Sequence, residues 1–212
     1  DTTPASTVWM ANLMSEFLPA GVFNVVCGER ETGASLVNHT RPDMVSITGS
    51  VGAGIQVAES AAKQVKRVHL ELGGKAPVVV FADADLAAAA EAIAIAGYFN
   101  AGQDCTAATR VIVQDSVYDD FVALLTEQAK GIALGAPHDD DVFLGPVNNS
   151  NQLARISDLL SRVPAHAQVM TGGSALDRPG FFFPATVVAG LAQDDELIQK
   201  EIFGPVITVQ KF

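Results

Sequence analysis

The chain has 212 residues, of which 49% are hydrophobic and 17% are charged, a composition typical of a globular protein with a sizeable core. Its net charge of -11 makes a nucleic acid a poor partner, since surfaces that bind phosphate backbones are basic. The two cysteines, Cys27 and Cys105, are too few for a disulfide scaffold and favour a reducing compartment, which we take to be the cytoplasm. We expect no membrane association, because the longest apolar stretch, residues 86–99, is rich in alanine and contains Glu91.

In the first third of the chain, helices and short apolar strands are predicted to alternate. Their ranges are a helix over residues 4–18, a strand over 23–27, a helix over 31–39, a strand over 44–48, a helix over 52–65 and a strand over 68–72. This alternation is typical of βαβ units, whose ligands lie beyond the carboxyl ends of parallel strands. Gly28, Gly49, Ser50 and Glu71 fall at such ends, so we expect a binding site there.

The pattern resumes after Gly74, and we place a domain boundary at Gly73–Gly74, which gives domains 1–73 and 74–212. Asp85 and Ser116 are predicted to cap helices. The second domain should contain strands over residues 76–81, 110–114, 169–171, 182–188 and 206–212, and helices over 85–99, from 116 onwards and over about 153–163. The first residues resemble a helix start and the last a strand inside a sheet, so we expect a fragment of a longer chain.

Cys105 is the first candidate for chemistry, because it follows an exposed-looking turn, Asn100-Ala-Gly-Gln-Asp104, at the end of a predicted helix. A thiolate is a strong nucleophile once a base or a lowered pKa activates it. The turn alone leaves a second interpretation open, that of a small buried apolar residue. Cys27, inside a predicted apolar strand, is interpreted as structural, and the four histidines show no metal-ligand spacing, so we expect no metal.

Glu71 and the stretch 49–54 are weaker candidates. Glu71 precedes two glycines, where a carboxylate in an apolar cleft can act as a base, although a solvated glutamate at a strand end is the commoner case. Gly49-Ser-Val-Gly-Ala-Gly54 follows a strand and opens a helix, which is the setting for a phosphate at a helix N-terminus. It lacks the third glycine of a dinucleotide-binding fingerprint and the lysine of a P-loop, so a plain strand-to-helix turn is the alternative.

Four blocks of sequence, in this order, together resemble the aldehyde dehydrogenase family. They are Thr48-Gly-Ser50 with Gly54, Leu70-Glu-Leu-Gly-Gly-Lys75, Gly102-Gln-Asp-Cys-Thr106 and Glu201-Ile-Phe-Gly-Pro-Val206. The resemblance covers all 212 residues and implies an α/β fold, in which part of a Rossmann-type NAD-binding sheet is followed by most of an α/β catalytic domain. Residues 98–100 and 103–106 are most similar to the aminoaldehyde branch of the family, especially the γ-aminobutyraldehyde dehydrogenases.

The resemblance implies an NAD-dependent oxidation of an aldehyde to a carboxylate. Cys105 would attack the aldehyde carbon to form a thiohemiacetal, and loss of hydride to NAD(P)⁺ would leave a thioester. Glu71 would activate the water that hydrolyses this thioester. The backbone N–H of Cys105 would stabilise the oxyanion, and Phe99 would line the aldehyde tunnel.

For the cofactor, the resemblance implies contacts from both predicted domains. Glu201 would bind the nicotinamide ribose, Phe203 would pack near the nicotinamide and Ser50 would contact the pyrophosphate. Asp1 would bind the adenosine ribose, and its charge would repel a 2′-phosphate and favour NAD over NADP. The remaining implied contacts are Gly28, Gly49, Gly54 and Leu72.

The resemblance also implies that parts of the site lie outside these residues. The family's chains are more than twice as long, and an upstream asparagine completes the oxyanion hole, so we expect the 212 residues alone to be inactive. We expect the full-length protein to act on a small aldehyde as a homo-oligomer, a dimer or a tetramer. Two alternatives stay open: a non-catalytic binding or structural domain, and a cysteine esterase or thioesterase that needs no hydride acceptor.

Overall fold

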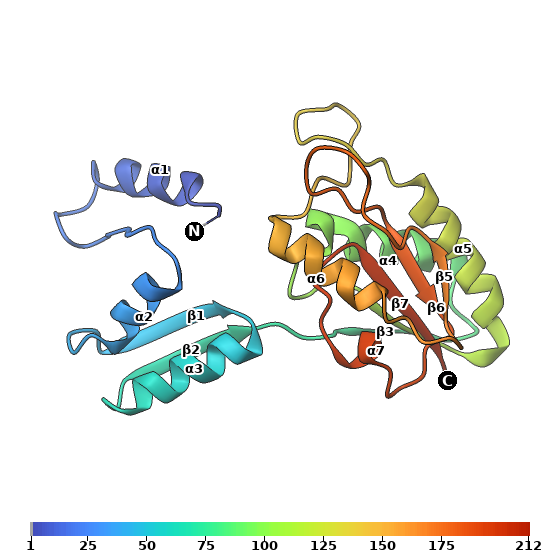
Figure 1. Ribbon diagram of the computed structural model, residues 1–212, viewed down its shortest axis with the longest axis horizontal. Coiled ribbons are helices and arrows are strands. Elements are labelled where there is room, and N and C mark those ends of the chain that lie inside the picture. Colours follow the sequence, from blue (N-terminus) through green and yellow to red (C-terminus); the bar gives the residue numbers. More distant parts are fainter. Residues whose placement is uncertain (1) are drawn as a thin grey trace. The chain divides into compact units, whose positions relative to one another are not determined.

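The first of two compact units is a βαβ arrangement with two further helices. The structure, a computed structural model, describes residues 2–212, and the chain divides between Gly73 and Gly74. The elements of the first unit are α1 (Ala5–Met14), α2 (Arg30–Asn38), β1 (Met44–Gly49), α3 (Val51–Ala62) and β2 (Arg67–Leu72) (Figure 1). Strands β1 and β2 are parallel, and helix α3 connects them and packs on both. The predicted α/β class with parallel strands is confirmed.

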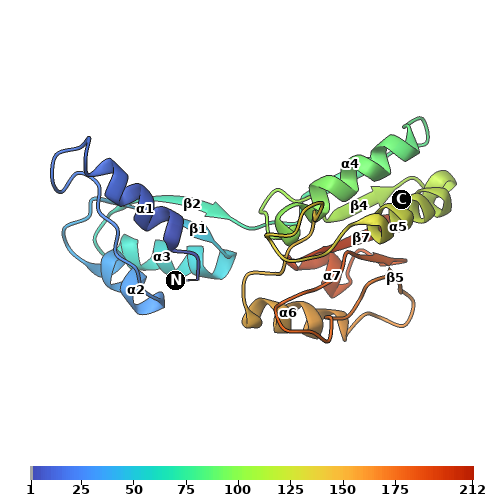
Figure 2. The same ribbon diagram turned by 90° about the horizontal axis from the view of Figure 1, so that it is seen from above.

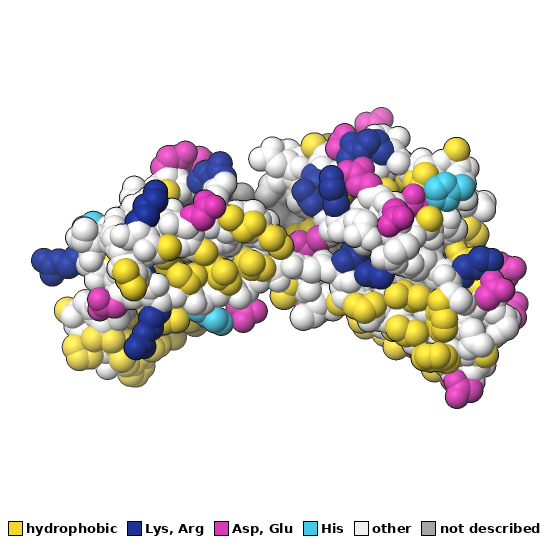
Figure 3. Space-filling model, turned by 90° about the horizontal axis from the view of Figure 1, so that it is seen from below, with side chains coloured by type: hydrophobic (Ala, Val, Ile, Leu, Met, Phe, Trp, Pro, Cys, Tyr) yellow, Lys and Arg dark blue, Asp and Glu magenta, His cyan; other side chains and the backbone are white. Residues whose placement is uncertain are grey.

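The first unit buries few of its hydrophobic side chains. Val45 and Ala61 are buried, whereas α1 buries none of its residues and leaves Trp9 exposed. Hydrophobic side chains also gather on the surface of this unit in the view of Figure 3. A two-stranded sheet offers too little apolar area to cover the helices around it.

The predicted strand over residues 23–27 is wrong. These residues form no regular element, and Cys27 is exposed, not enclosed in a sheet. A strand needs a partner for its backbone N–H and C=O groups. In the part of the chain that the structure describes, the sheet of this unit contains β1 and β2 alone, and neither pairs with residues 23–27.

The second unit is built on a five-stranded sheet with the strand order β3-β4-β7-β6-β5. Its elements are β3 (Pro77–Val80), α4 (Leu86–Tyr98), β4 (Arg110–Val113), α5 (Tyr118–Gly131), α6 (Ser150–Leu160), β5 (Gln168–Thr171), β6 (Thr186–Ala189), α7 (Glu196–Gln199) and β7 (Val206–Lys211). Strands β3, β4, β7 and β6 are parallel, and β5 is antiparallel to β6. The last strand of the chain, β7, therefore lies in the middle of the sheet.

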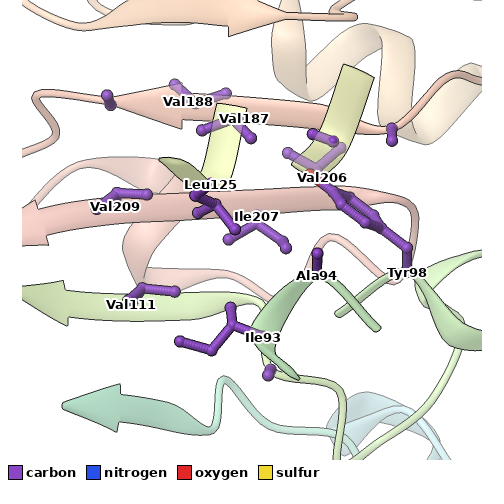
Figure 4. Close-up of a cluster of buried hydrophobic side chains, with 14 of the residues drawn as sticks. Ile93, Ala94, Tyr98, Val111, Leu125, Val187, Val188, Val206, Ile207 and Val209 are labelled. Atoms are coloured by element: carbon purple, nitrogen blue, oxygen red, sulfur yellow. The ribbon is translucent and has the colours of Figure 1, made fainter. Parts of the chain in front are cut away.

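Helices α4 and α5 cover one face of this sheet and α6 lies on the other (Figures 1 and 2). Side chains from α4, α5 and the central strands interdigitate in the core, as Ile93, Leu125 and Ile207 show (Figure 4). Helix α4 approaches β7 closely, because a Cβ at Gly97 would lie 2.6 Å from Ile207 Cδ1. The buried Tyr98 donates a hydrogen bond of 3.0 Å from its hydroxyl to the carbonyl oxygen of Thr186. The end of α4, from which the chain runs to Cys105, is thus firmly packed.

The boundaries of two predicted elements in the second unit are wrong. Ser116 does not cap α5, because residues 115–117 form a 3-10 turn and Val117 precedes the helix. The strand predicted over residues 182–188 is shorter, since only Thr186–Ala189 pair with neighbouring strands. Asp85 does cap α4, with its Oδ1 accepting a hydrogen bond of 3.1 Å from the Ala88 N–H. Among residues 2–212, no helix has the length and apolar character that crossing a membrane requires.

Candidate functional site

The turn before Cys105 has an uncommon backbone. Asn100, Ala101 and Gly102 have φ values of 51°, 57° and 67°, a left-handed conformation that non-glycine residues adopt when their surroundings enforce it. The Asn100 side-chain amide donates to the Gln103 carbonyl at 3.0 Å, and the Gln103 N–H donates to the Asn100 carbonyl at 3.1 Å. Gln103 Oε1 accepts from the backbone N–H of Asn148 at 2.8 Å. The turn is therefore fixed before the chain reaches Cys105.

Cys105 itself lies in an exposed turn beside Asp104. Asp104 Oδ1 accepts hydrogen bonds from the backbone N–H and the hydroxyl of Thr106, each 2.7 Å long, and these bonds lower the pKa of Asp104. Because Cys105 is exposed, its interpretation as a small buried residue is wrong. Within residues 2–212, the Cys105 N–H has no hydrogen-bond partner, so it is available to an oxyanion.

The loop after α7 carries Glu201 and Phe203 and touches the turn before Cys105. A Cβ added to Gly102 would lie 2.1 Å from the carbonyl oxygen of Gly204, so the two backbones are in direct contact. Phe203 has a φ of 59°, and Glu201 Oε1 accepts a hydrogen bond of 3.2 Å from the Gly74 N–H. The structure thus brings together two of the sequence blocks that are about 100 positions apart, those of Cys105 and Glu201.

Lys75 places a buried amine within electrostatic reach of Glu201. Its Nζ is buried and, among the described residues, has no hydrogen-bond partner. Desolvation lowers the pKa of Lys75 to about 7; repulsion from Arg110 acts in the same direction and attraction to Glu201 opposes it. Such an amine titrates near neutral pH. The sequence contained a signal for it, since Lys75 ends the block Leu70–Lys75, but burial cannot be read from that block.

In the first unit, the junction of β1 and α3 lies beside the end of β2, because Gly49 pairs with Leu72 in the sheet and Gly54 on α3 packs against the Leu72 side chain. Ser50 Oγ accepts a hydrogen bond of 3.2 Å from the Ala53 N–H and so caps the 12-residue helix α3. Gly54 allows α3 to approach β2, because a Cβ there would lie 2.6 Å from Leu72 Cδ2. A Cβ at Gly49 would meet nothing nearer than 3.7 Å. The uncovered N–H groups at the start of α3 can bind an anion beyond the end of β1.

A cavity of about 490 Å³ lies between α2, β1 and α3. No sequence motif marks it, because its walls come from three separate elements. Arg30 and Gln56 bridge its two helices through a hydrogen bond of 3.2 Å from Arg30 Nη2 to Gln56 Oε1. Gly28 precedes α2. A Cβ at Gly28 would lie 2.1 Å from Thr32 Oγ1, so the packing of this residue against α2 is sufficient reason for a glycine.

Glu71 lies on β2 on the same face as His69, as the alternation of the strand predicts. Its Oε1 is 3.2 Å from His69 Nε2, and His69 Nδ1 is 3.1 Å from Ser46 Oγ. The Glu71 side chain is 62% exposed, so this carboxylate is solvated, which is the commoner of the two cases that the sequence left open. Glu71 belongs to the first unit and Cys105 to the second.

Phe99 and Asp1 are the remaining residues that the sequence predicts to contact a ligand. Phe99 is 58% exposed and follows α4 directly, so its ring is accessible to a ligand. Asp1 lies outside the described residues. Over residues 2–212, no group of three or more His, Cys, Asp or Glu side chains has the arrangement to hold a metal ion.

Comparison with known sequences identifies relatives that extend over the whole chain. The model of the aldehyde dehydrogenase family matches residues 1–212. Lactaldehyde dehydrogenase from Escherichia coli is 40% identical over 214 residues, which cover 99% of this chain and 45% of the relative. Cytosolic aldehyde dehydrogenase 1 from Rattus norvegicus is 42% identical over 216 residues, which cover 100% of this chain and 43% of the relative. The chain thus spans less than half the length of these relatives.

Solved structures agree with these sequence matches. The crystal structure of the Escherichia coli lactaldehyde dehydrogenase superposes with a TM-score of 0.96 at 40% identity, over 99% of this chain and 45% of that chain. Betaine aldehyde dehydrogenase from Staphylococcus aureus, solved in complex with NAD⁺, gives a TM-score of 0.95 at 36% identity, over 99% of this chain and 43% of that chain. Sequence, fold and the family match over residues 1–212 lead to one conclusion: this chain belongs to the aldehyde dehydrogenase family.

Proposed function

We propose that the complete polypeptide is an NAD-dependent aldehyde dehydrogenase, to which this chain supplies the nucleophile Cys105 and the base Glu71. The observation that supports this most is the contact between Gly102 and Gly204. It joins the turn that leads to an exposed thiol to the loop that carries Glu201 and Phe203. A thiol beside a cofactor-binding loop suits a reaction in which the carbon bound to sulfur loses a hydride.

The residues of the first unit fit a dinucleotide. The capped N-terminus of α3 offers backbone N–H groups to a pyrophosphate beside Ser50, and Gly49 leaves room for it to approach. The cavity of about 490 Å³ has the size of a small-ligand site, and we assign the adenosine part of NAD to it. We assign Gly28, Gly54 and Leu72 to the surroundings of the bound dinucleotide, and Glu201 and Phe203 to the binding of the nicotinamide riboside. When bound, NAD⁺ supplies the acceptor for the hydride.

The residues of this chain carry the other steps. Cys105 adds as a thiolate to the carbonyl carbon of the aldehyde, and its backbone N–H donates to the oxygen that becomes negative. When the C–H bond gives up its hydride, the C=O bond forms again and a thioester remains. Glu71 takes a proton from water, the water oxygen attacks the thioester carbon and the C–S bond breaks. The products are a carboxylate and the free thiolate, and overall aldehyde, NAD⁺ and water yield carboxylate, NADH and two protons.

An aminoaldehyde such as 4-aminobutanal is the substrate that we propose. The similarity of residues 98–100 and 103–106 to the aminoaldehyde branch supports it, and Phe99 would line the path to the thiol. The test measures kcat/KM of the complete polypeptide for 4-aminobutanal, lactaldehyde and betaine aldehyde, with NAD⁺ and with NADP⁺. The highest value should belong to 4-aminobutanal with NAD⁺. A higher kcat/KM for another aldehyde contradicts the proposed substrate. If none of the three aldehydes yields NADH, the proposal of a dehydrogenase is wrong.

The units receive roles within this proposal. Residues 1–73 form the C-terminal part of an NAD-binding domain, and residues 74–212 form most of a catalytic domain. The complete polypeptide would work as a dimer or tetramer in the cytoplasm, with no nucleic-acid or membrane partner. Size-exclusion chromatography with light scattering tests the oligomer, and a monomer contradicts it.

Hydrolysis of an ester or thioester by Cys105 is a second candidate function. It is favoured by the exposed thiol and by the Cys105 N–H, which has no hydrogen-bond partner among residues 2–212; hydrolysis of an ester needs no hydride acceptor. Turnover of an activated ester without NAD⁺, together with no NADH from any aldehyde, would select it. Absence of both activities in the complete polypeptide would select the non-catalytic alternative.

A further inference from the structure

One face of α6 contacts the loop that carries Glu201 and Phe203. Gln152 Nε2 donates two hydrogen bonds, of 3.0 Å to the Ile202 carbonyl and of 2.7 Å to the Phe203 carbonyl. Arg155 Nη2 donates a hydrogen bond of 2.6 Å to the Glu201 carbonyl. The two donors are three positions apart, a spacing that puts them on one side of a helix. They therefore hold three consecutive carbonyl groups of this loop from a single rigid element.

The same end of α6 reaches the turn before Cys105. The backbone N–H of Asn148, two residues before α6, donates to Gln103 Oε1 at 2.8 Å. Asn149 caps the helix, since its Oδ1 accepts a hydrogen bond of 2.9 Å from the Gln152 N–H. The position of the turn is thus tied to the first turn of α6, which also carries Gln152.

Side-chain packing also holds α6 against the loop that carries Glu201 and Phe203. Ile156 is buried one position after Arg155, and a Cβ at Gly204 would lie 2.3 Å from Ile156 Cδ1. On its other side, the Gly204 carbonyl touches Gly102. The loop is therefore enclosed between α6 and the turn, and it holds Phe203 at a φ of 59°, a conformation that needs such support.

We propose that Gln152, Arg155 and Ile156 form a positioning surface, the α6 platform, that keeps Glu201 and Phe203 in register with the turn leading to Cys105. The proposal rests on the proposed function, because the loop it positions is the cofactor loop. Gln152 and Arg155 bind the backbone carbonyls of the loop, so they affect the cofactor site through the positions of Glu201 and Phe203. They are positioning residues and not catalytic ones.

The first test measures hydrogen exchange in the complete polypeptide without cofactor. Gln152→Met keeps the length of the side chain and removes its donors, and Asn151→Met, at an exposed neighbouring position, is the matched control. We expect peptides covering residues 199–206 and 100–106 to exchange at least about fivefold faster in Gln152→Met and at the wild-type rate in the control. Unchanged exchange in both peptides overturns the platform, whatever the activity.

The second test separates positioning from plain stability. Gln152→Met and Arg155→Ala should each raise the KM for NAD⁺ about tenfold and leave the KM for the aldehyde within about twofold. Arg155→Lys should recover most of the loss, because lysine keeps one donor for the Glu201 carbonyl. Equal changes in both KM values, or a lower Tm with unchanged kinetics, overturn the positioning role. A third outcome is that hydrogen exchange is faster in Gln152→Met as expected while the wild type oxidises no aldehyde. In that case the proposed function is wrong, but the contacts of α6 with the Glu201 loop and with the turn before Cys105 are confirmed.

Discussion

Gly102 and Gly204 touch through their backbones: a Cβ on Gly102 would lie 2.1 Å from the carbonyl oxygen of Gly204 and 2.9 Å from the nitrogen of Pro205. Gly102 also has a φ of 67°, where side chains are disfavoured. Two requirements, space and backbone conformation, therefore select glycine at this position. The positions of Cys105 and of the Glu201 loop depend on each other through this contact.

Gly102→Ala should separate these two segments. The added methyl group collides with backbone atoms that cannot rotate away, so we expect a loss of about 1–3 kcal/mol in the free energy of unfolding. We also expect kcat/KM to fall at least about 100-fold, because small displacements of reacting groups are costly. The measurement is urea unfolding and steady-state kinetics of the complete polypeptide. Gly131→Ala is the control, since a Cβ there meets nothing within 4 Å, and equal behaviour of the two variants would refute the close contact.

Glu71→Gln should change the time course of NADH formation. Glutamine cannot take the proton from water, so thioester hydrolysis slows while hydride transfer continues. We expect a rapid burst of about one NADH per active site and then a steady rate at least about 100-fold below that of the wild type. Stopped-flow absorbance of NADH measures both phases. An unchanged steady rate would show that another group is the base.

Local patterns in the sequence predicted most elements of the fold. The strand predicted over residues 44–48 is β1 (Met44–Gly49), and the alanine-rich helix capped by Asp85 is α4. Both follow from neighbouring residues, through apolar runs and cap signals. The segment 23–27 has an equally apolar sequence and forms no strand, because strand formation depends on a partner that the segment itself does not specify.

The site was predictable only as a set of separate blocks. Motifs pointed to Cys105 and Glu201, but no pattern indicated that Gly102 meets Gly204 or that Gln152 holds the Phe203 carbonyl. Those contacts join residues about 50 to 100 positions apart, and they depend on how strands and helices pack. The solvated state of Glu71 is also a tertiary property, since it depends on which elements cover the end of β2.

The stability of the protein should depend on the titration of Lys75. Its pKa falls from 10.5 to about 7 on folding, so between these values the unfolded state binds a proton that the folded state lacks. The free energy of unfolding therefore rises with pH across this window, and the titration of Lys75 adds up to about 1.4 kcal/mol per pH unit to that rise. This stability is lost again as the pH falls to about 7. Lys75→Met removes the slope, and urea unfolding of both proteins between about pH 7 and pH 10 measures it. A wild-type minus variant difference that stays constant with pH would contradict the lowered pKa.

Tyr98→Phe should weaken the packing between α4 and β6. The substitution leaves the buried Thr186 carbonyl without the 3.0 Å hydrogen bond from the Tyr98 hydroxyl, so we expect a loss of about 1–3 kcal/mol in the free energy of unfolding. Tyr118→Phe is the comparison, because Tyr118 is half-buried. Its hydroxyl donates at 3.4 Å to the Val209 carbonyl and accepts at 2.7 Å from the Gly190 N–H, but it lies nearer to water, which can replace the lost partner. A smaller loss for Tyr98→Phe than for Tyr118→Phe would argue against this account.

Trapping the covalent intermediate tests the central claim, that Cys105 is the nucleophile, most directly. Glu71→Gln in the complete polypeptide is mixed with an aldehyde and NAD⁺, quenched in acid during the burst and digested for peptide mass spectrometry. The account predicts an acyl group on the peptide that contains Cys105, in an amount equal to the NADH formed, and an unmodified Cys27. NADH formation with an unmodified Cys105, or an acyl group on Cys27, would contradict it.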